Sequence, residues 1–125
     1  MQDKIIQQYA EDIKAISSVI ETYIEGGKKG DASIMKQVFR ENATMHGYFD
    51  GDLLAVPIQV LYDFVAENPD SPELHVENIS IDVVNTIATA KIETTKWLDH
   101  HFTDQFTLFK EDGKWLIVSK VFHAH

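Results

Sequence analysis

Apolar residues in the first quarter of the chain recur at spacings of three and four positions. This spacing places them on one face of an α-helix. The apolar stripe consists of Ile6, Tyr9, Ile13, Ile16, Ile20 and Tyr23. We therefore predict a long helix, and we expect Gly26 and Gly27 to end it, because glycine accepts the left-handed conformation common at helix C-termini.

Two shorter helices are predicted before residue 69. Asp31 is a suitable N-cap for the first, and Pro57 suits the first turn of the second, where its missing N–H costs nothing. Their apolar residues are Ile34, Met35, Val38 and Phe39, and Ile58, Leu61, Tyr62 and Val65. Between these helices we expect a short strand from Thr44 to Phe49 and a turn at residues 50–52.

After Pro72 the apolar period changes to two, which is typical of β-strands. Strands are predicted at residues 74–84, 87–97, 101–110 and 114–124. Neighbours joined by such short turns must be antiparallel. We predict one α+β domain over residues 1–125, with three N-terminal helical segments packed on a strongly curved, mainly antiparallel sheet that encloses a pocket.

The last hairpin brings a carboxylate and an amine onto one face. Residues 111–113 suit a three-residue loop, which places Lys110 opposite Lys114. The register then pairs Leu108 with Leu116, Phe106 with Val118, Asp104 with Lys120, and Phe102 with Phe122. A buried carboxylate either stays ionised beside an amine or takes up a proton. The pair is therefore either a structural ion pair or part of a functional site.

The opposite face of this hairpin is half polar with aromatic residues between. The predicted register places Thr103, Gln105, Thr107 and Phe109 there, against Trp115, Ile117, Ser119 and Val121. Exposed apolar patches often mark contacts between subunits. We therefore expect a homodimer that forms through this outer face.

Composition and charge narrow the class of partner. The 125 residues include 20 acidic and 11 basic side chains, for a net charge of −9. An acidic chain without a basic stripe is a poor nucleic-acid binder, and no apolar run is long enough to span a membrane. The chain has no cysteine, and Met1 to Lys14 lack the pattern of a signal peptide. We predict a cytoplasmic protein.

Several segments together resemble the nuclear transport factor 2-like superfamily. They are Tyr23, Gly30-Asp31, Phe39, Asn42-Ala43-Thr44, Asp104-Gln105-Phe106, residues 112–115 and Lys120-Val121-Phe122-His123. That superfamily includes ketosteroid isomerases, scytalone dehydratase and SnoaL-like polyketide cyclases. The C-terminal segment is most similar to the family described as "putative lumazine-binding". The resemblance implies a cystatin-like α+β barrel or cone around a pocket.

The resemblance to ketosteroid isomerases extends to two residues and fails at a third. Tyr23 matches a tyrosine that donates to the oxyanion, and Asp104 matches a protonated aspartate beside it. The general-base aspartate would fall at Gly47, which moves no proton. His46 is then the best acid–base candidate, although a histidine satisfied by a backbone carbonyl is the commoner case.

Four histidines lie near the predicted C-terminal hairpin. His100, His101, His123 and His125 include a pair, His101 and His123, that the predicted register places face to face on the outer side. Two imidazoles without a third fixed ligand make a poor zinc site. We predict no metal and no cofactor.

Three hypotheses follow. In the first, the chain is a binding module whose mainly apolar pocket holds a small cyclic molecule. The predicted ligand-binding residues are Tyr23, Phe39, Tyr48, Phe102, Asp104, Phe106, Lys120 and Phe122. In the second, it is a cofactor-independent isomerase, dehydratase or cyclase acting on a cyclic ketone, with His46 as base and Tyr23 and Asp104 as oxyanion donors. In the third, it is a dimerisation or scaffold domain without a ligand.

Overall fold

A computed structural model describes residues 2–125 of the chain. The helices are α1 (Gln2–Lys29), α2 (Ala32–Met35) with the short 3₁₀ turn η1 (Lys36–Val38), and α3 (Gln59–Glu67). The strands are β1 (Phe39–Phe49), β2 (Asp52–Pro57), β3 (His75–Val84), β4 (Ile87–Trp97), β5 (His100–Glu111) and β6 (Lys114–Ala124). The α+β class and the four long C-terminal strands are confirmed, each strand to within one residue.

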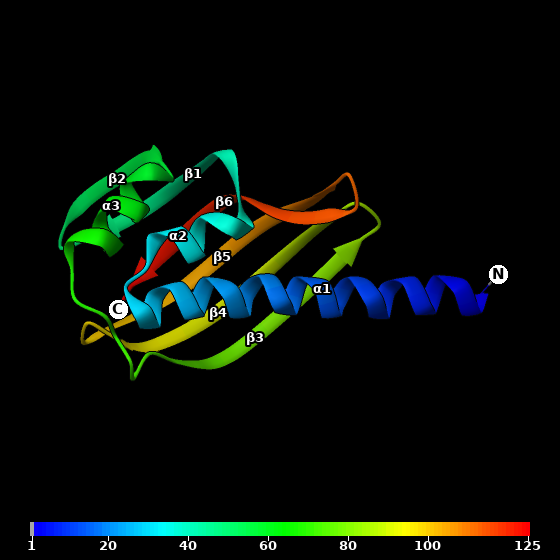
Figure 1. Ribbon diagram of the computed structural model, residues 1–125, viewed down its shortest axis with the longest axis horizontal. Coiled ribbons are helices and arrows are strands. Elements are labelled where there is room, and N and C mark those ends of the chain that lie inside the picture. The colour runs from blue at the N-terminus through cyan, green and yellow to red at the C-terminus, as the bar shows by residue number, and fades with distance from the viewer. Residues whose placement is uncertain (1) are drawn as a thin grey trace.

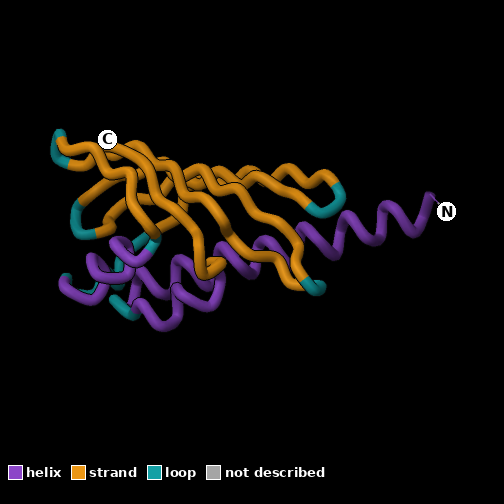
Figure 2. The backbone as a smooth tube through the Cα atoms, turned by 90° about the horizontal axis from the view of Figure 1, so that it is seen from above, coloured by secondary structure: helices purple, strands orange, loops and turns teal. Residues whose placement is uncertain are grey.

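The six strands form one open sheet in the order β2-β1-β6-β5-β4-β3. All three helices cover the same face of it, so that the molecule has two layers (Figures 1 and 2). Neighbours are antiparallel except β1 and β6, which are parallel, with Met45 beside Lys120. The sheet is therefore mixed rather than wholly antiparallel, and it curves without closing into a barrel.

The first helix is longer than predicted. It passes through Gly26 and Gly27, and Gly30 adopts the left-handed φ of 62° just after its end. The two helical glycines instead permit close packing, because a Cβ on Gly27 would lie 2.8 Å from Leu74 Cδ2 and 3.0 Å from Trp97 Cζ2. At the other end Ile6 and Tyr9 are exposed, because α1 extends beyond the sheet there (Figure 1). Only the part of the stripe from Ile13 onward is wholly or partly buried.

Residues 52–57 form a strand that was not predicted from the sequence. The Asp50-Gly51 turn, with φ values of 52° and 84°, folds β2 back along β1, as two-residue hairpin turns with positive φ do. Pro57 ends this strand instead of opening the helix, and α3 begins at Gln59. The predicted apolar face of α3 is confirmed as buried: Ile58, Leu61, Tyr62 and Val65. Asp31 caps α2 as predicted, accepting from the backbone N–H of Ser33 at 2.9 Å.

The register of the last hairpin differs from the prediction. Its turn is the two-residue pair Asp112-Gly113, so Glu111 rather than Lys110 stands opposite Lys114. A β-bulge then leaves Val118 unpaired between Ile117 and Ser119. The predicted pairing of Asp104 with Lys120 is therefore wrong, since Asp104 pairs with Phe122 and Lys120 with Phe106. The pairing is shifted by two residues in total. Because side chains alternate between the two faces, Asp104 and Lys120 still face the same side of the sheet.

The shorter turn also changes which residues face outward near it. Trp115 and Ile117 were predicted on the outer face, but both are buried among the helices. Beyond the bulge, on the Ser119 side, the predicted faces hold: Lys120 and Phe122 are buried while Val121 is exposed.

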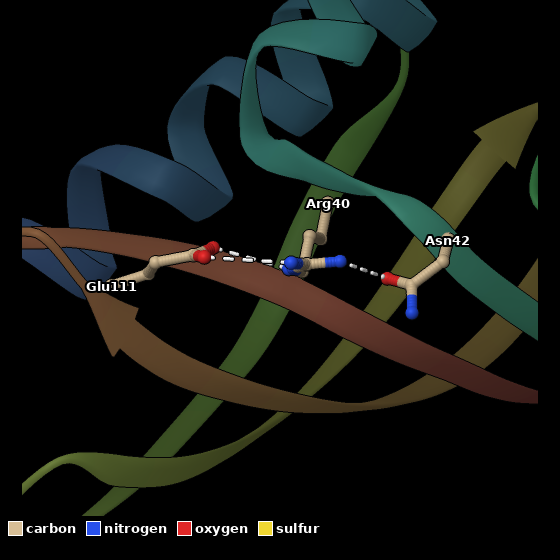
Figure 3. Close-up of polar contacts among 3 residues, drawn as sticks. All are labelled: Arg40, Asn42 and Glu111. Atoms are coloured by element: carbon tan, nitrogen blue, oxygen red, sulfur yellow. Dashed lines mark hydrogen bonds and ion pairs between the residues drawn. The ribbon is translucent and has the colours of Figure 1, made fainter.

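An ion pair on the surface connects β1 with the end of β5. Arg40 donates from Nε to Glu111 Oε1 at 3.1 Å and from a second guanidinium nitrogen to Asn42 (Figure 3). The bond to Glu111 raises the pKa of Arg40. Both side chains are more than a third exposed, so water screens the pair and its contribution to stability is small.

Asp12 connects the long helix to the last hairpin. Its Oδ1 accepts from Lys110 Nζ at 3.0 Å, Trp115 Nε1 at 3.2 Å and Gln8 Nε2 at 3.2 Å. Burial raises the pKa of Asp12, but these hydrogen bonds and the charge of Lys110 outweigh that effect and leave the pKa below its ordinary value of 3.8.

Asp12→Asn is expected to destabilise the protein by about 2 kcal/mol at neutral pH, because it removes the charged acceptor of these bonds. The lowered pKa means that the carboxylate contributes stability above its unfolded pKa and loses it as the pH falls through its folded pKa. Urea unfolding at pH 7 and near pH 3 checks this: the difference between variant and parent should shrink in acid. Glu11→Gln, on the exposed side of the same turn, is the control and should change little at either pH. A loss that is equal at both pH values would contradict the prediction.

Candidate ligand pocket

A cavity of about 450 Å³ lies between α3, the β1–β2 hairpin and the inner face of β5 and β6. These elements gather at the end of the sheet far from the N terminus of α1 (Figure 1). The cavity is lined by Met45, Phe49, Leu54, Val60, Leu61, Asp63, Phe64, Glu67, Phe102, Lys120 and Phe122. Asp63 and Glu67 are exposed on α3 and form an acidic rim, whereas the walls below are almost entirely apolar.

Aromatic rings form much of the wall. Phe49 meets Phe64 edge to face at 5.9 Å and stacks on Phe102 at 6.0 Å with an interplanar angle of 23°. Phe102 in turn meets Phe122 edge to face at 6.1 Å. Such ring pairs hold one another in place, so the wall offers a fixed set of flat and edge surfaces to a planar ligand.

Lys120 supplies the one amine of the lining. Its side chain is 6% exposed, and Nζ lies 3.3 Å from Asp104 Oδ1, 3.8 Å from Met45 Sδ and 4.4 Å from the centre of the Phe122 ring. An ammonium has three N–H donors. Within residues 2–125 its one well-oriented hydrogen bond goes to the weak acceptor Met45 Sδ. The amine therefore keeps donor capacity for an oxygen in the cavity.

Asp104 lies behind this amine and is 1% exposed. Its Oδ2 accepts a hydrogen bond from the Tyr23 hydroxyl at 3.2 Å. Its Oδ1 is close to Lys120 but has no well-oriented hydrogen bond from any residue between 2 and 125. Burial, together with the charge and hydrogen bond of Asp104, raises the pKa of Tyr23 far above its ordinary value, so Tyr23 stays a donor. Tyr23, Asp104 and Lys120 thus form a line of polar groups that ends at the cavity.

The structure separates the predicted site residues into three groups. Phe102, Lys120 and Phe122 line the cavity. Tyr23, Phe39, Asp104 and Phe106 are buried in the core and do not line it. His46 and Tyr48 lie on the opposite face of the sheet and are exposed, Tyr48 by 63%. The prediction that the last two line the pocket is wrong.

The position of His46 follows from strand alternation. Met45, Gly47 and Phe49 face the helices, so their neighbours His46 and Tyr48 face away. His46 therefore does not serve a ligand in this cavity as a base. Gly47 faces inward but has no free space: a Cβ there would lie 2.5 Å from the Phe122 carbonyl oxygen and 2.7 Å from its ring. Phe122 occupies the space that a side chain at position 47 would need.

Eight lining residues were not predicted as ligand contacts. They are Met45, Phe49, Leu54, Val60, Leu61, Asp63, Phe64 and Glu67. Three of them come from residues 45–54, and the alternation of side chains around Gly47 indicated that Met45 and Phe49 share a face. The others required knowledge that α3 packs over this hairpin, which no local pattern gives.

His101, His123 and His125 cluster on the outer face but not in the predicted way, whereas His100 packs against Phe49 and Phe102. His123 pairs with Thr103 rather than with His101. The His125 ring stacks on His101 at 4.2 Å and meets His123 at 4.6 Å. Desolvation, followed by the charges of His101 and His123, lowers the pKa of His125. Within residues 2–125 no three His, Asp or Glu side chains converge as metal ligands.

A family model described as "Putative lumazine-binding" matches residues 11–123 of the chain. The chain belongs to this family. A nuclear transport factor 2-like protein of unknown function from Shewanella baltica is 41% identical, covers 94% of this chain and 96% of its own, and superposes with a TM-score of 0.88. The predicted superfamily is therefore confirmed.

One further similar protein and one further solved structure bear on this chain in different ways. Aldolase FrzH from Cladobotryum sp. is 29% identical over 113 residues, which span 89% of this chain and 90% of that protein. A protein with a cystatin-like fold from Nostoc punctiforme is 14% identical with a TM-score of 0.74, covering 93% and 92% of the two chains. The likeness to the Nostoc protein shows the fold alone.

The helices within residues 2–125 include none with the length and hydropathy of a membrane span.

The buried ion pair between Lys120 and Asp104 is expected to affect the free energy of unfolding. Lys120→Met leaves Asp104 without its counter-charge, and Asp104→Leu strands the ammonium, so each change is expected to cost about 3–5 kcal/mol. The double variant removes both charges and should recover most of that loss. Urea unfolding of the four proteins measures the coupling directly. If the two losses simply add, the pair does not interact as described.

Proposed function

We propose that this protein binds a small, mainly apolar cyclic molecule whose carbonyl oxygen accepts a hydrogen bond from Lys120. The observation that supports this most directly is a buried amine, with unused donors, in a cavity wall that is otherwise apolar below its acidic rim. Ligand pockets commonly combine apolar and aromatic walls with a few well-placed polar groups, and a volume of about 450 Å³ lies within their usual range.

The acidic rim favours a neutral ligand over a strongly anionic one. Asp63 and Glu67 stand at the cavity lining on α3, and the whole chain carries a net charge of −9. Both repel phosphates and polycarboxylates before they reach Lys120. A ketone or a cyclic amide satisfies the amine without meeting this repulsion. Pterin-like heterocycles, which the family description suggests, carry such carbonyl groups.

The second candidate is an enzyme that acts next to a carbonyl group. The similarity to a protein named aldolase favours it, since aldolases make or break carbon–carbon bonds beside carbonyls. An isomerase mechanism with His46 as base receives no support, because His46 is exposed on the other side of the sheet. Any chemistry in this cavity would instead involve Lys120 and Asp104.

A thermal-shift screen of ring ketones, pterins and flavins tests ligand binding. A true ligand binds only the native state and should raise the melting temperature in a concentration-dependent way, by several degrees at about 100 times its Kd. We expect neutral ring ketones to give larger shifts than phosphorylated flavins. The shift should disappear in Lys120→Met.

Two further variants separate a specific pocket from general effects. Lys114→Met changes an exposed lysine on the same strand as Lys120 and should leave the shift intact. Leu54→Trp places a large ring into the cavity wall without touching the ion pair, and should abolish it. If no compound binds and Leu54→Trp stabilises the free protein, the scaffold hypothesis is favoured instead.

We further propose that the chain forms a homodimer through the outer face of the sheet. Val84, Ile87 and Val121 are exposed there. Asp82 and Lys91 stand on the same face, and opposite charges on one face allow a two-fold contact in which each meets its counterpart. A second copy would cover these apolar side chains.

Light scattering during size-exclusion chromatography at micromolar concentration tests the dimer. Val121→Glu and Ile87→Glu place charges within the proposed contact and should each yield a monomer. Ile5→Glu changes an exposed apolar residue on α1 and should leave the dimer intact. A parent chain that elutes as a monomer would contradict the proposal.

Two further proposals concern the domain organisation and the cellular location of the protein. All described elements contribute to one sheet and the layer packed on it, which supports a single domain over residues 1–125. The absence of cysteine suits a cytoplasmic location.

A further inference from the structure

Lys120 combines features that make a lysine a nucleophile. Its side chain is 6% exposed, an aromatic ring and a thioether flank its amine, and a carboxylate lies 3.3 Å away. Lysines removed from water in apolar pockets attack carbonyl carbons to form Schiff bases. Among the polar side chains of β5 and β6, only Lys120 lines the cavity.

We propose that Lys120 forms a Schiff base with a ketone or aldehyde bound in this cavity. The proposal rests on the proposed function, because the same carbonyl group that accepts a hydrogen bond from Nζ becomes the group that is attacked. It goes beyond binding in assigning a covalent intermediate and a nucleophile.

The attack requires a neutral amine, and Asp104 is placed to create one. Its Oδ1 lies 3.3 Å from Nζ and has no well-oriented hydrogen bond from any residue between 2 and 125, so it is free to take a proton from the ammonium. Water does not compete strongly for the proton, since Asp104 is 1% exposed.

The reaction balances without any further reactant. The ammonium gives one proton to Asp104, and the Nζ lone pair forms a bond to the carbonyl carbon. The carbonyl oxygen takes up the proton that Asp104 holds, and the nitrogen releases another to Asp104. This second proton then goes to the hydroxyl group, which leaves as water while the C=N bond forms. Ammonium and carbonyl become iminium and water, and Asp104 is again a carboxylate beside a cation.

Tyr23 is a positioning residue in this scheme. Its hydroxyl donates to Oδ2 of Asp104 and so leaves the other oxygen directed at the amine. Phe39, Trp97 and Phe106 surround the tyrosine ring at centroid distances of 5.1–6.0 Å and fix its position. The carboxylate is thereby held in one orientation through the proton transfers.

Reductive trapping tests the proposal. The full-length protein is incubated with cyclohexanone and sodium cyanoborohydride, and the modified lysine is identified by peptide mass spectrometry. We expect Lys120 to be alkylated at least about tenfold faster than any exposed lysine, as an activated amine requires. In parallel, 2,4-pentanedione should give the near-ultraviolet absorption of an enaminone.

Variants assign the signal to this site. Lys114→Met should retain the absorption, whereas Leu54→Trp, which leaves the ion pair intact, should lose it. Tyr23→Phe should slow the trapping and shift its pH profile, and a purely structural role would not shift that profile. Lys120→Arg, which keeps a cation but cannot form an imine, should show no adduct.

The outcomes separate this proposal from the proposed function. If cyclohexanone raises the melting temperature through Lys120 but no adduct forms there, the pocket stands and the Schiff base is overturned. Equal labelling of Lys120 and Lys114 overturns it as well. If the ketone neither stabilises the protein nor reacts with it, the proposed function fails together with this inference.

Discussion

The buried contact between Asp104 and Lys120 is the constraint on which the rest of the structure depends. Neither charge is tolerable at this depth without the other, so β5 and β6 must keep both side chains on the inner face. The β-bulge at Val118 meets this requirement, because Trp115 and Ile117 face inward before it and the extra residue brings Lys120, which regular alternation would turn outward, to the same inner face. Tyr23 extends the constraint to the long helix, because its hydroxyl donates a hydrogen bond to Oδ2 of the Asp104 carboxylate. The sheet register, the position of the long helix and the polar end of the cavity therefore all depend on this one contact.

Local patterns predicted the elements well and the long-range pairing poorly. The four long strands follow from period-two alternation and from turn residues, which are properties of neighbours in sequence. The parallel contact of β1 with β6 joins residues far apart in the chain, and no local signal specifies it. The strand at residues 52–57 was missed because Leu53, Leu54, Ala55 and Val56 do not alternate in polarity, although their side chains do alternate in position.

The candidate site was predicted in part, for the same reason. Asp104 and Lys120 were found together because an acid and an amine among phenylalanines are conspicuous in sequence. The predicted register had one residue too many in the turn and lacked the bulge, and these two errors cancelled in their effect on side-chain direction. The prediction for His46 had no compensating error. Histidine is a common acid–base residue, but His46 lies on the face of β1 that points away from the cavity. A residue type indicates what a group is able to do, and only packing decides whether it has a target.

The parallel pairing of β1 with β6 also has a consequence for synthesis on the ribosome. Met45 and Lys120 lie side by side, so β1 must wait for almost the entire remaining chain before its partner emerges. Until then one edge of the β1–β2 hairpin carries unpaired backbone groups, and the phenylalanines of the cavity wall are open to water. The final strand thus both completes the sheet and ends the interval in which the nascent chain is prone to aggregate.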